Sequence, residues 1–555
     1  MPTIKSYNKR LEMLKSERSS FIPLYRELSD NHLAHRGRFL SSDRNKGHKR
    51  NTKQFNNTSR LSARTLASGM MAGITSPARP WFRLSSGDKD LDDFASVKEW
   101  LHDVQNIMYH VYSSSNAYNA LHMTYAELGV FGTGVMGVYG DFEKGIWCKP
   151  YTVGSYCLGA DGQNKTDTFY REYEQTVGQI VKEFGIENCS QSVKQQWERG
   201  NTETWIKLVH LVEPNDDRDH QSPLAKDMPF RSAYYEVAAG RTGEDKFLRQ
   251  SGFMTNPILA PRWDITGEDI YATDCPGITA IGDTKALQLG ERRMYQAPDK
   301  AVDPPLQGPS SMKNKVSRSV KPGDMLWLPN TDGAGFRSVY DMRPDYNGMI
   351  MVNDRVEGRV QRAFYEDLFL MLANSDRRQI TAREVAEKHE EKLLMLGPVL
   401  ERLHNELLDP LIDRTFDILV EAGPMPPPPE ELQGRELNIE YVSVLAQAQR
   451  LVNTGAIERL TQFTGSLTAV WPEARHKVDA SQAVDDYASA LGVNPKSVRT
   501  DEEAAQMSQA EQQAAQQAAQ MQQATEMVDV AATASNIDTN EDNAVGAMMR
   551  NAGLA

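Results

Sequence analysis

The sequence predicts an α+β fold that is mostly helical. Apolar residues recur at steps of three and four in several long segments, which is the spacing of one face of a helix. Short runs that alternate in polarity are confined to residues 134–260 and predict strands there. No regular alternation of helices with the apolar strands of a parallel sheet is apparent, so the class is α+β and not α/β.

The N-terminal half divides into a helical part and a strand-rich part. Ile4, Tyr7, Leu11, Leu14 and Phe21 predict one helix face, apart from one gap in their spacing. Further helices are expected at residues 56–74, 91–128 and 177–199. The runs TDTFYREYEQT and ETWIKLVHLVE predict strands.

Two long helices are expected on either side of a region rich in proline and glycine. Residues 279–297 form the first. Residues 346–373 contain no proline and predict the second, because apolar residues stand at nearly every fourth position: Val352, Val356, Val360, Phe364, Leu368 and Leu372. The prolines and glycines between the helices exclude long regular elements.

The stretch LLMLGPVLERLHNELLDPL, residues 393–411, predicts two helical segments joined at a bend. Thr381 and Glu384 fit a capping box that starts the first segment. Gly397 tolerates the bend, and Pro398 suits the first turn of the second segment, where its missing N–H has no partner. Residues 435–495 are expected to be mostly helical, and an Ala- and Gln-rich helix is expected after Thr500.

Composition restricts the possible functions. The net charge of −13 argues against a protein that grips nucleic acid tightly. Basic residues nevertheless cluster at residues 36–53 and 313–321, where a solvated loop and contact with an acidic partner or DNA both remain open. The four cysteines lack the spacing of a metal site or a disulfide framework, and no apolar run approaches the ~18 residues of a membrane span.

Two partial matches to phosphate-binding motifs are rejected. GTGVMG, Gly132 to Gly137, stands between a predicted helix and a predicted strand, whereas a dinucleotide site needs a strand followed by a helix. A tight helix-to-strand turn is expected instead. In GITAIGDT, Asp283 replaces the lysine of a phosphate loop and repels phosphate. No catalytic motif occurs, and His389 and His404 are expected on the surface.

Four stretches together resemble the portal proteins of short-tailed bacteriophages, also called head-to-tail connectors. They are LASGMMAGITSPARPWFRL at residues 66–84, GTGVMGVYGD with VGSYCLGADG at residues 132–162, PGITAIGDTKALQLGE at residues 276–291, and the pattern TAxEV…LGPxxxRLxxExLxPL from Thr381 to Leu411. The resemblance extends in matching order from about residue 60 to residue 500.

The resemblance implies a ring, usually of twelve subunits, at one capsid vertex, with double-stranded DNA passing through its central channel. It implies no catalytic site, cofactor or metal. The regions that it implies are an α+β wing with N-terminal helices at 1–278, a first stem helix at 279–302, a clip at 303–345, a second stem helix at 346–373, a tunnel loop at 374–381, a bent wing/crown helix at 382–434, a crown at 435–500 and a C-terminal helix, as barrel or flexible tail, at 501–555.

Site residues and partners follow from the same resemblance. The tunnel loop lines the DNA channel with Asn374, Ser375, Asp376, Arg377, Arg378 and Gln379. For Arg377 and Arg378, capping of the C-terminus of the preceding helix stays open as an alternative. The clip docks the terminase large subunit and then the tail adaptor protein through Lys313, Lys315, Arg318 and Lys321. Major capsid protein and scaffolding or internal core proteins are further partners, and no membrane is involved. The expected location is the virion, after assembly in the host bacterial cytoplasm.

Two other functions are alternatives to a portal. One is another ring of the phage neck or tail, or an internal scaffold protein. The other is a nucleotide-dependent oxidoreductase, for which GTGVMG is the sole support.

Overall fold

The computed structural model divides the chain into two units, Met1–Arg450 and Leu451–Ala555. The residues that it describes are 3–39, 54–78, 80–88, 91, 94–222, 224–238, 246–304, 306–309, 325–328, 337–338, 345–374, 396–432, 438–441, 458–468, 471, 473, 477–491, 504 and 506–518. The second unit contains α16 (Ala480–Leu491). The first unit contains the elements discussed below.

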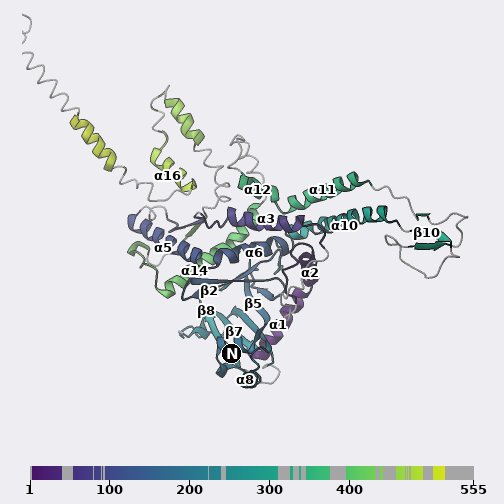
Figure 1. Cartoon of the computed structure of the whole chain (residues 1–555). Coiled ribbons are helices and arrows are strands. Elements are labelled where there is room, and N and C mark those ends of the chain that lie inside the picture. The colour runs from purple at the N-terminus through teal and green to yellow at the C-terminus, as the bar shows by residue number, and fades with distance from the viewer. Residues whose placement is uncertain are drawn as a thin grey trace, which may run out of the picture. The chain divides into compact units, whose positions relative to one another are not determined.

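Helices and strands both build the first unit, and helices predominate, which confirms the expected class (Figure 1). The helices are α1 (Ile4–Ser19), α2 (Ile22–Asn31), α3 (Thr58–Gly73), α5 (Ala95–Ser114), α6 (Ala117–Phe131), α7 (Val177–Phe184), α8 (Gln191–Glu198), α10 (Pro276–Val302), α11 (Tyr346–Ala363), α12 (Glu366–Asn374) and α14 (Asp409–Ala422). The strands are β1 (Phe82–Ser85), β2 (Val135–Asp141), β3 (Gly145–Tyr151), β4 (Tyr156–Ala160), β5 (Thr166–Thr176), β6 (Trp205–Pro214), β7 (Phe230–Glu236), β8 (Phe247–Phe253), β9 (Ile258–Leu259), β10 (Leu306–Pro309), β11 (Met325–Leu328), β12 (Arg337–Ser338) and β13 (Asn438–Tyr441).

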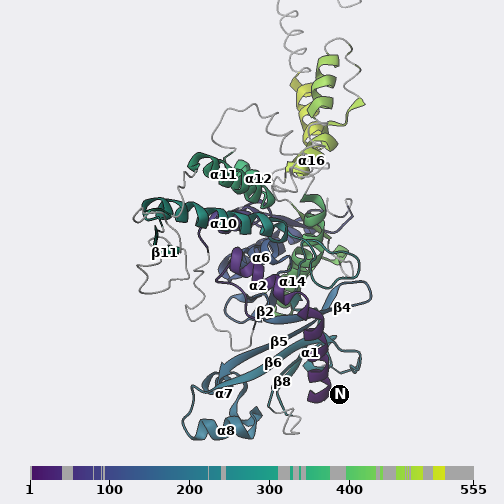
Figure 2. The same ribbon diagram turned by 90° about the vertical axis from the view of Figure 1, so that its right-hand side faces the viewer.

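The largest sheet is a five-stranded antiparallel meander in the order β4-β5-β6-β7-β8 (Figure 2). Helix α1 covers one face of it with the predicted stripe of Ile4, Tyr7, Leu11 and Leu14. The stripe packs against residues such as Tyr170 that project from the same face of the strands. A second sheet, β3-β2-β9, lies beside the meander.

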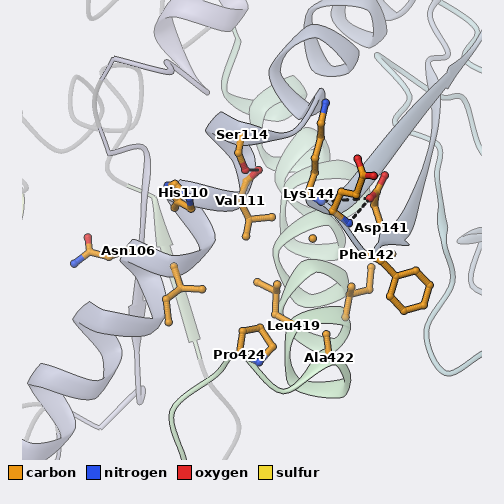
Figure 3. A pocket seen from close by; sticks show the side chains of 15 residues that line it. Asn106, His110, Val111, Ser114, Asp141, Phe142, Lys144, Leu419, Ala422 and Pro424 are labelled. Atoms are coloured by element: carbon orange, nitrogen blue, oxygen red, sulfur yellow. Dashed lines mark hydrogen bonds between the residues drawn. The ribbon is translucent and has the colours of Figure 1, made fainter.

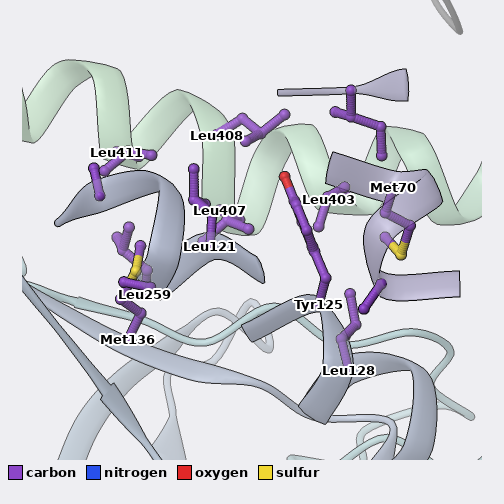
Figure 4. Close-up of a cluster of buried hydrophobic side chains, with 14 of the residues drawn as sticks. Met70, Leu121, Tyr125, Leu128, Met136, Leu259, Leu403, Leu407, Leu408 and Leu411 are labelled. Atoms are coloured by element: carbon purple, nitrogen blue, oxygen red, sulfur yellow. The ribbon is translucent and has the colours of Figure 1, made fainter. Parts of the chain in front are cut away.

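The main hydrophobic core lies where α3, α5 and α6 meet a long helix, described from Leu396, that continues through α14. Figure 4 shows part of this core. The predicted leucine stripe supplies its inner face. Figure 4 shows Leu403, Leu407 and Leu411 directed toward Leu121 and Tyr125 of α6. All four cysteines are buried and free. No described helix has the length and apolar composition needed to cross a membrane.

The GTGVMG stretch is the tight helix-to-strand turn that the sequence predicts. Helix α6 ends at Phe131, Gly132 caps it with a left-handed φ of 78°, and β2 begins at Val135. A residue with a side chain rarely adopts this backbone conformation, so the glycine makes the turn possible. The geometry is the reverse of a dinucleotide site.

Two predicted helices are interrupted by contacts with distant residues. The helix expected at residues 91–128 breaks before Ala117. The Asn116 side chain there donates to the carbonyl of Cys148 on β3 (2.7 Å) and accepts from its N–H (2.9 Å). The break thus ties the helices to the β3 edge.

A continuous helix over residues 346–373 was also expected, and this was wrong. Helix α11 ends at Ala363, and Tyr365 has a left-handed φ of 54° before α12 begins. The turn places Phe364 edge-on against His32, with ring centroids 5.5 Å apart, and Phe369 against Gly69 of α3. These two contacts, on either side of the turn, fix α12 against α3 and His32.

Strands β1 and β13, which lie far apart in the sequence, form a two-stranded sheet in the first unit. They pair antiparallel, with Phe82 opposite Tyr441 and Ser85 opposite Asn438. Among the described residues, the last strand of the first unit therefore pairs with its first strand.

Helix α10 meets α6 at a contact that only glycine allows. A Cβ added to Gly277 would lie 2.2 Å from the Val130 carbonyl oxygen, whereas one on Gly282 would meet nothing within 4 Å. We expect Gly277→Ala to lower the free energy of unfolding by about 1–3 kcal/mol, because α10 must shift. Gly282→Ala on the same helix is the control and should raise it by up to ~1 kcal/mol. Thermal unfolding measures both, and equal midpoints for the two variants would contradict the close contact.

Candidate functional site

Most site residues expected from the sequence lie outside the described residues. These are the clip residues Lys313, Lys315, Arg318 and Lys321 and the tunnel-loop residues Ser375, Asp376, Arg377, Arg378 and Gln379. Asn374 is the last residue of α12. Gly397 and Pro398 lie in the first described turn of the helix from Leu396, but the preceding arm is outside the described residues. The bend therefore stays a prediction.

Helices α10 and α11 form an antiparallel pair. Asp283 on α10 pairs with Arg359 on α11 (Oδ1–Nη2 2.7 Å), and further along the pair Glu291 accepts a hydrogen bond from Asn353 (3.4 Å). Between the two helices the chain forms a small sheet in the order β11-β10-β12. The sequence thus builds a helix, a small sheet and a returning helix.

A layer of polar side chains fixes this helix pair to the segment before α3. The carboxamide of Gln288 accepts from the backbone N–H groups of Phe55 (2.6 Å) and Asn56 (3.0 Å) and donates to the Asn56 carbonyl (2.7 Å). The Asn56 side chain in turn donates to Glu357 on α11 (2.6 Å). These hydrogen bonds fix the position of α10 relative to residues 55 and 56. Breaking any of them would leave a buried polar group unpaired, which costs free energy.

The same pair exposes many apolar side chains beyond this layer. On α11, Val356 and Val360 of the predicted stripe are buried, but Val352 is 61% and Met351 71% exposed. The other exposed apolar residues of the pair are Leu289, Tyr295, Val302, Tyr346 and Ile350. A concentration of such residues on one element marks a surface for another chain. The stripe did not predict the exposure of Val352, since α11 extends past the core there.

A second exposed apolar feature, which no sequence pattern predicted, is the tip of the β2–β3 hairpin. Phe142 there is fully exposed. The Asp141 carboxylate accepts from the N–H groups of Glu143 (2.8 Å) and Lys144 (3.2 Å) and so fixes the turn. The residue borders a hollow of about 880 Å³ that Val111 and Leu419 also line. Figure 3 shows these side chains and the phenyl ring at the edge of the group.

The long helix of the core contains a π-helical turn, η5 (His404–Leu408). The Asp409 N–H donates to the carbonyl of His404, five residues earlier. Pro410 follows immediately, and a proline has no N–H and clashes with the preceding turn of an α-helix. The wider turn relieves this clash and rotates the residues before it.

The widened turn presents Glu406 to Arg262, whose side chain is only 3% exposed. Arg262 Nη2 lies 2.6 Å and Nε 3.1 Å from Glu406 Oε1, and the Arg262 backbone N–H donates to Oε2 at 2.8 Å. The remaining guanidinium N–H groups donate to Asn164 and to the carbonyl of Asp269. All five donors of the guanidinium are thus used.

Arg402, one turn before Glu406, strengthens this joint. Its Nη1 donates to the Trp263 carbonyl (3.2 Å) and to Asp264 Oδ1 (3.1 Å). The RLxxE part of the signature therefore holds residues 262–264 against the helix. The sequence identified Arg402 and Glu406 as part of a pattern but not their partners.

Two expectations about charged or titratable residues need correction. Surface placement of His404 was wrong, because the side chain is partly buried and burial lowers its pKa to about 4. Arg36, in the basic cluster at residues 36–53, was expected either in a solvated loop or in contact with an acidic partner or DNA. Its side chain is mostly buried and is already paired within the chain. It pairs with the buried Glu127 (3.1 Å), whose pKa burial raises. Residues 40–53 lie outside the described residues.

Comparison with known proteins gives concordant matches over nearly the whole chain. The model of a family described as "Bacteriophage head to tail connecting protein" matches residues 4–498. The chain is 42% identical over 543 residues to the "Probable portal protein" of Bordetella phage BPP-1, which spans 97% of this chain and 96% of that protein. It is 42% identical over 546 residues to the "Portal protein" of Salmonella phage epsilon15, which spans 98% of each.

The joint between Arg262 and Glu406 can be tested by removing one charge. Glu406→Gln keeps the shape but leaves a buried guanidinium without its counter-charge, which costs about 3–5 kcal/mol in comparable pairs. Glu401→Gln, an exposed position on the same helix, is the matched control. We expect the midpoint of thermal unfolding of Glu406→Gln to be clearly lower than that of wild type, and the midpoint of Glu401→Gln to equal that of wild type. Equal midpoints for the two variants would show that the ion pair between Arg262 and Glu406 does not hold the helix against residues 262–264.

Proposed function

The chain belongs to the family of bacteriophage head to tail connecting proteins, the portal proteins, and we propose that twelve copies form a ring at the unique capsid vertex. Double-stranded DNA passes through the central channel of this ring during packaging and ejection. The ring is a structural part of the virion and has no catalytic site, cofactor or metal of its own. It assembles in the cytoplasm of the host bacterium.

The observation that carries this proposal is the exposed apolar surface of α10 and α11. A closed ring needs a head-to-tail interface, in which one surface of each copy contacts a different surface of the next. Met351 and Val352 are large, apolar and exposed, and α11 begins with the exposed Ile350 and Tyr346 on the same part of the pair. Contact with the next copy removes this surface from water.

The order of elements supports the assignment of regions. We assign residues 279–302 of α10 and residues 346–373, which contain α11 and most of α12, to the stem, and residues 303–345 between them to the clip. Residues 1–278 form the wing, residues 374–381 the tunnel loop, residues 382–434 the bent helix and residues 435–500 the crown. Residues 501–555 form a helical barrel or tails on the DNA-entry side.

The charge of the chain suits a conduit. DNA that must slide is slowed by every contact that neutralises a phosphate, because the release of counterions stabilises the bound state. A net charge of −13 limits such contacts. Arg377 and Arg378 in the tunnel loop then supply the few that the channel makes at its narrowest part.

The partners follow from the two ends of the ring. The clip docks the terminase large subunit during packaging and the tail adaptor afterwards. The wing contacts the major capsid protein, and the crown side faces scaffolding or internal core proteins. A different neck ring or an internal scaffold is excluded if the protein occupies the DNA-entry vertex in capsids.

The ring and its interface are tested together by native mass spectrometry and negative-stain microscopy. Wild-type protein should give twelve-subunit rings with a central hole. Met351→Glu combined with Val352→Glu should shift most of the protein to smaller species, because carboxylates are then buried at the interface. Trp197→Glu, at an exposed apolar position on α8, should leave the rings intact. Rings of wild-type yield from the double variant would place the interface elsewhere.

The docking role of the clip is tested by charge reversal. Replacing Lys313, Lys315, Arg318 and Lys321 with glutamate should weaken adaptor binding at least tenfold, since opposed charges become like charges, while rings still form. The control reverses four exposed lysines outside the clip, namely Lys5, Lys9, Lys182 and Lys226. Pull-down with the tail adaptor at fixed ionic strength compares the two. Unchanged binding by the clip variant would remove these residues from the docking surface.

A further inference from the structure

A row of four side chains crosses the face of the five-stranded sheet opposite α1. Arg171 on β5 stands opposite His210 on β6, His210 stands opposite Tyr234 on β7, and Tyr234 stands opposite Arg249 on β8. The row therefore has an arginine at each end and two aromatic rings between them. His210 and Tyr234 stack with centroids 4.1 Å apart and an interplanar angle of 8°.

Strand β3 of the neighbouring sheet faces this row across a cavity of about 430 Å³. It contributes Trp147, Lys149 and Tyr151, and β2 contributes Tyr139, whose hydroxyl lies 2.9 Å from that of Tyr151. Trp147 is 43% exposed, so the cavity has an aromatic side chain that solvent reaches. Its volume lies within the range of small-molecule sites.

Three cationic side chains line the cavity, Lys149, Arg171 and Arg249, and the lining includes one carboxylate, that of Glu183. Arg171 lies 3.8 Å from the ring centre of Tyr173, Lys149 5.4 Å from that of Trp147 and Arg249 4.7 Å from that of Tyr234. Glu183 is the one carboxylate of the lining, and it lies 3.7 Å from Arg249. Among the described residues, neither Arg171 nor Lys149 has a carboxylate partner within ion-pair distance.

The electrostatic environment agrees with an excess of positive charge. Burial, together with the nearby Arg171, lowers the pKa of Lys149 to about 8, and Glu183 opposes this shift. Burial and the same cations, with Arg249, hold the pKa of His210 well below its ordinary value. The imidazole is therefore neutral at pH 7. The remaining titratable groups that face the cavity are the phenols of Tyr139, Tyr151, Tyr173 and Tyr234.

We propose that this cavity binds the phosphate group of a small phosphate ester, with Arg171 and Lys149 on the phosphate oxygens and the aromatic walls beside the organic part. A guanidinium and an ammonium match a tetrahedral dianion in charge, and arginine can bond two of its oxygens at once. The dianion balances the excess of cations over Glu183. The site is separate from the ring function proposed above, so rings can form whether or not it is occupied.

Titration calorimetry on the full chain tests the site with three ligands. Inorganic phosphate and sulfate probe the anion alone, and deoxyadenosine monophosphate adds an aromatic base. We expect all three to bind wild type, and the nucleotide to bind more tightly than phosphate, because the aromatic walls contact its base. Equal affinities of phosphate and nucleotide would overturn the role of the aromatic walls. No binding of any ligand at millimolar concentration would overturn the proposal.

Two variants and a matched control connect binding to these residues. Lys149→Gln and Arg171→Gln should each raise the Kd for phosphate at least tenfold, because each removes a charged donor. Lys207→Gln removes the same charge from a neighbouring strand of the meander, where Lys207 lies 3.9 Å from Glu172, and should bind as wild type does. Native mass spectrometry checks that each variant assembles as wild type does. Equal affinities for wild type and both cavity variants would overturn the proposal.

Sulfate gives a second readout, because its charge does not change between pH 7 and 9.5. An anion beside Lys149 favours the charged amine and raises its pKa, so binding at pH 8.5 should take up protons. Affinity should fall as pH rises through about 8, the pKa of the free lysine. Lys149→Arg, which stays charged, should retain binding and lose the proton uptake. Proton uptake by Lys149→Arg equal to that of wild type would assign it to another group and overturn the role of Lys149.

Discussion

One buried guanidinium holds the strands and the last long helix of the first unit together. Arg262 follows β9 and uses all five of its N–H donors, and its counter-charge comes from Glu406, far along the chain. A buried cation without its partner is strongly destabilising, so the helix from Leu396 has one favourable position along the strands. The π-helical turn and Pro410 belong to the same constraint, because they set the direction in which Glu406 projects. The leucines of that helix then complete the core on α6.

The helix pair depends on this core at its base. Gly277 lets α10 approach α6, and Gln288 ties α10 to residues 55 and 56. These contacts are short and directional, so they set the direction in which the pair leaves the core. Beyond them several exposed side chains are apolar, among them Tyr295, Met351 and Val352. The helix pair thus has a base fixed by directional contacts and an outer part with exposed apolar residues, a surface suited to a neighbouring chain.

The sequence predicted the features that local patterns determine. The α1 stripe, the β5 run and the turn at Gly132 appear where the residues place them, because periodicity and glycine conformation act over a few positions. The breaks at Asn116 and Tyr365 could not be predicted, since Cys148, His32 and Gly69 impose them from far away in the sequence. The row of side chains from Arg171 to Arg249 could not be predicted either. It forms only because three pairs of strands adopt a particular register, which local sequence patterns do not determine. The predicted clip and tunnel-loop residues remain predictions.

The pairing of β1 with β13 has a consequence for how the protein is made. Phe82 leaves the ribosome early, but its partner Tyr441 appears only when most of the chain has been synthesised. At roughly 5–20 residues per second, β1 waits tens of seconds for its partner. A prematurely terminated chain lacks this pairing and keeps an open strand edge, which chaperones and proteases recognise. The pairing of residues 82–85 with residues 438–441 thus acts as a check that synthesis has passed residue 441.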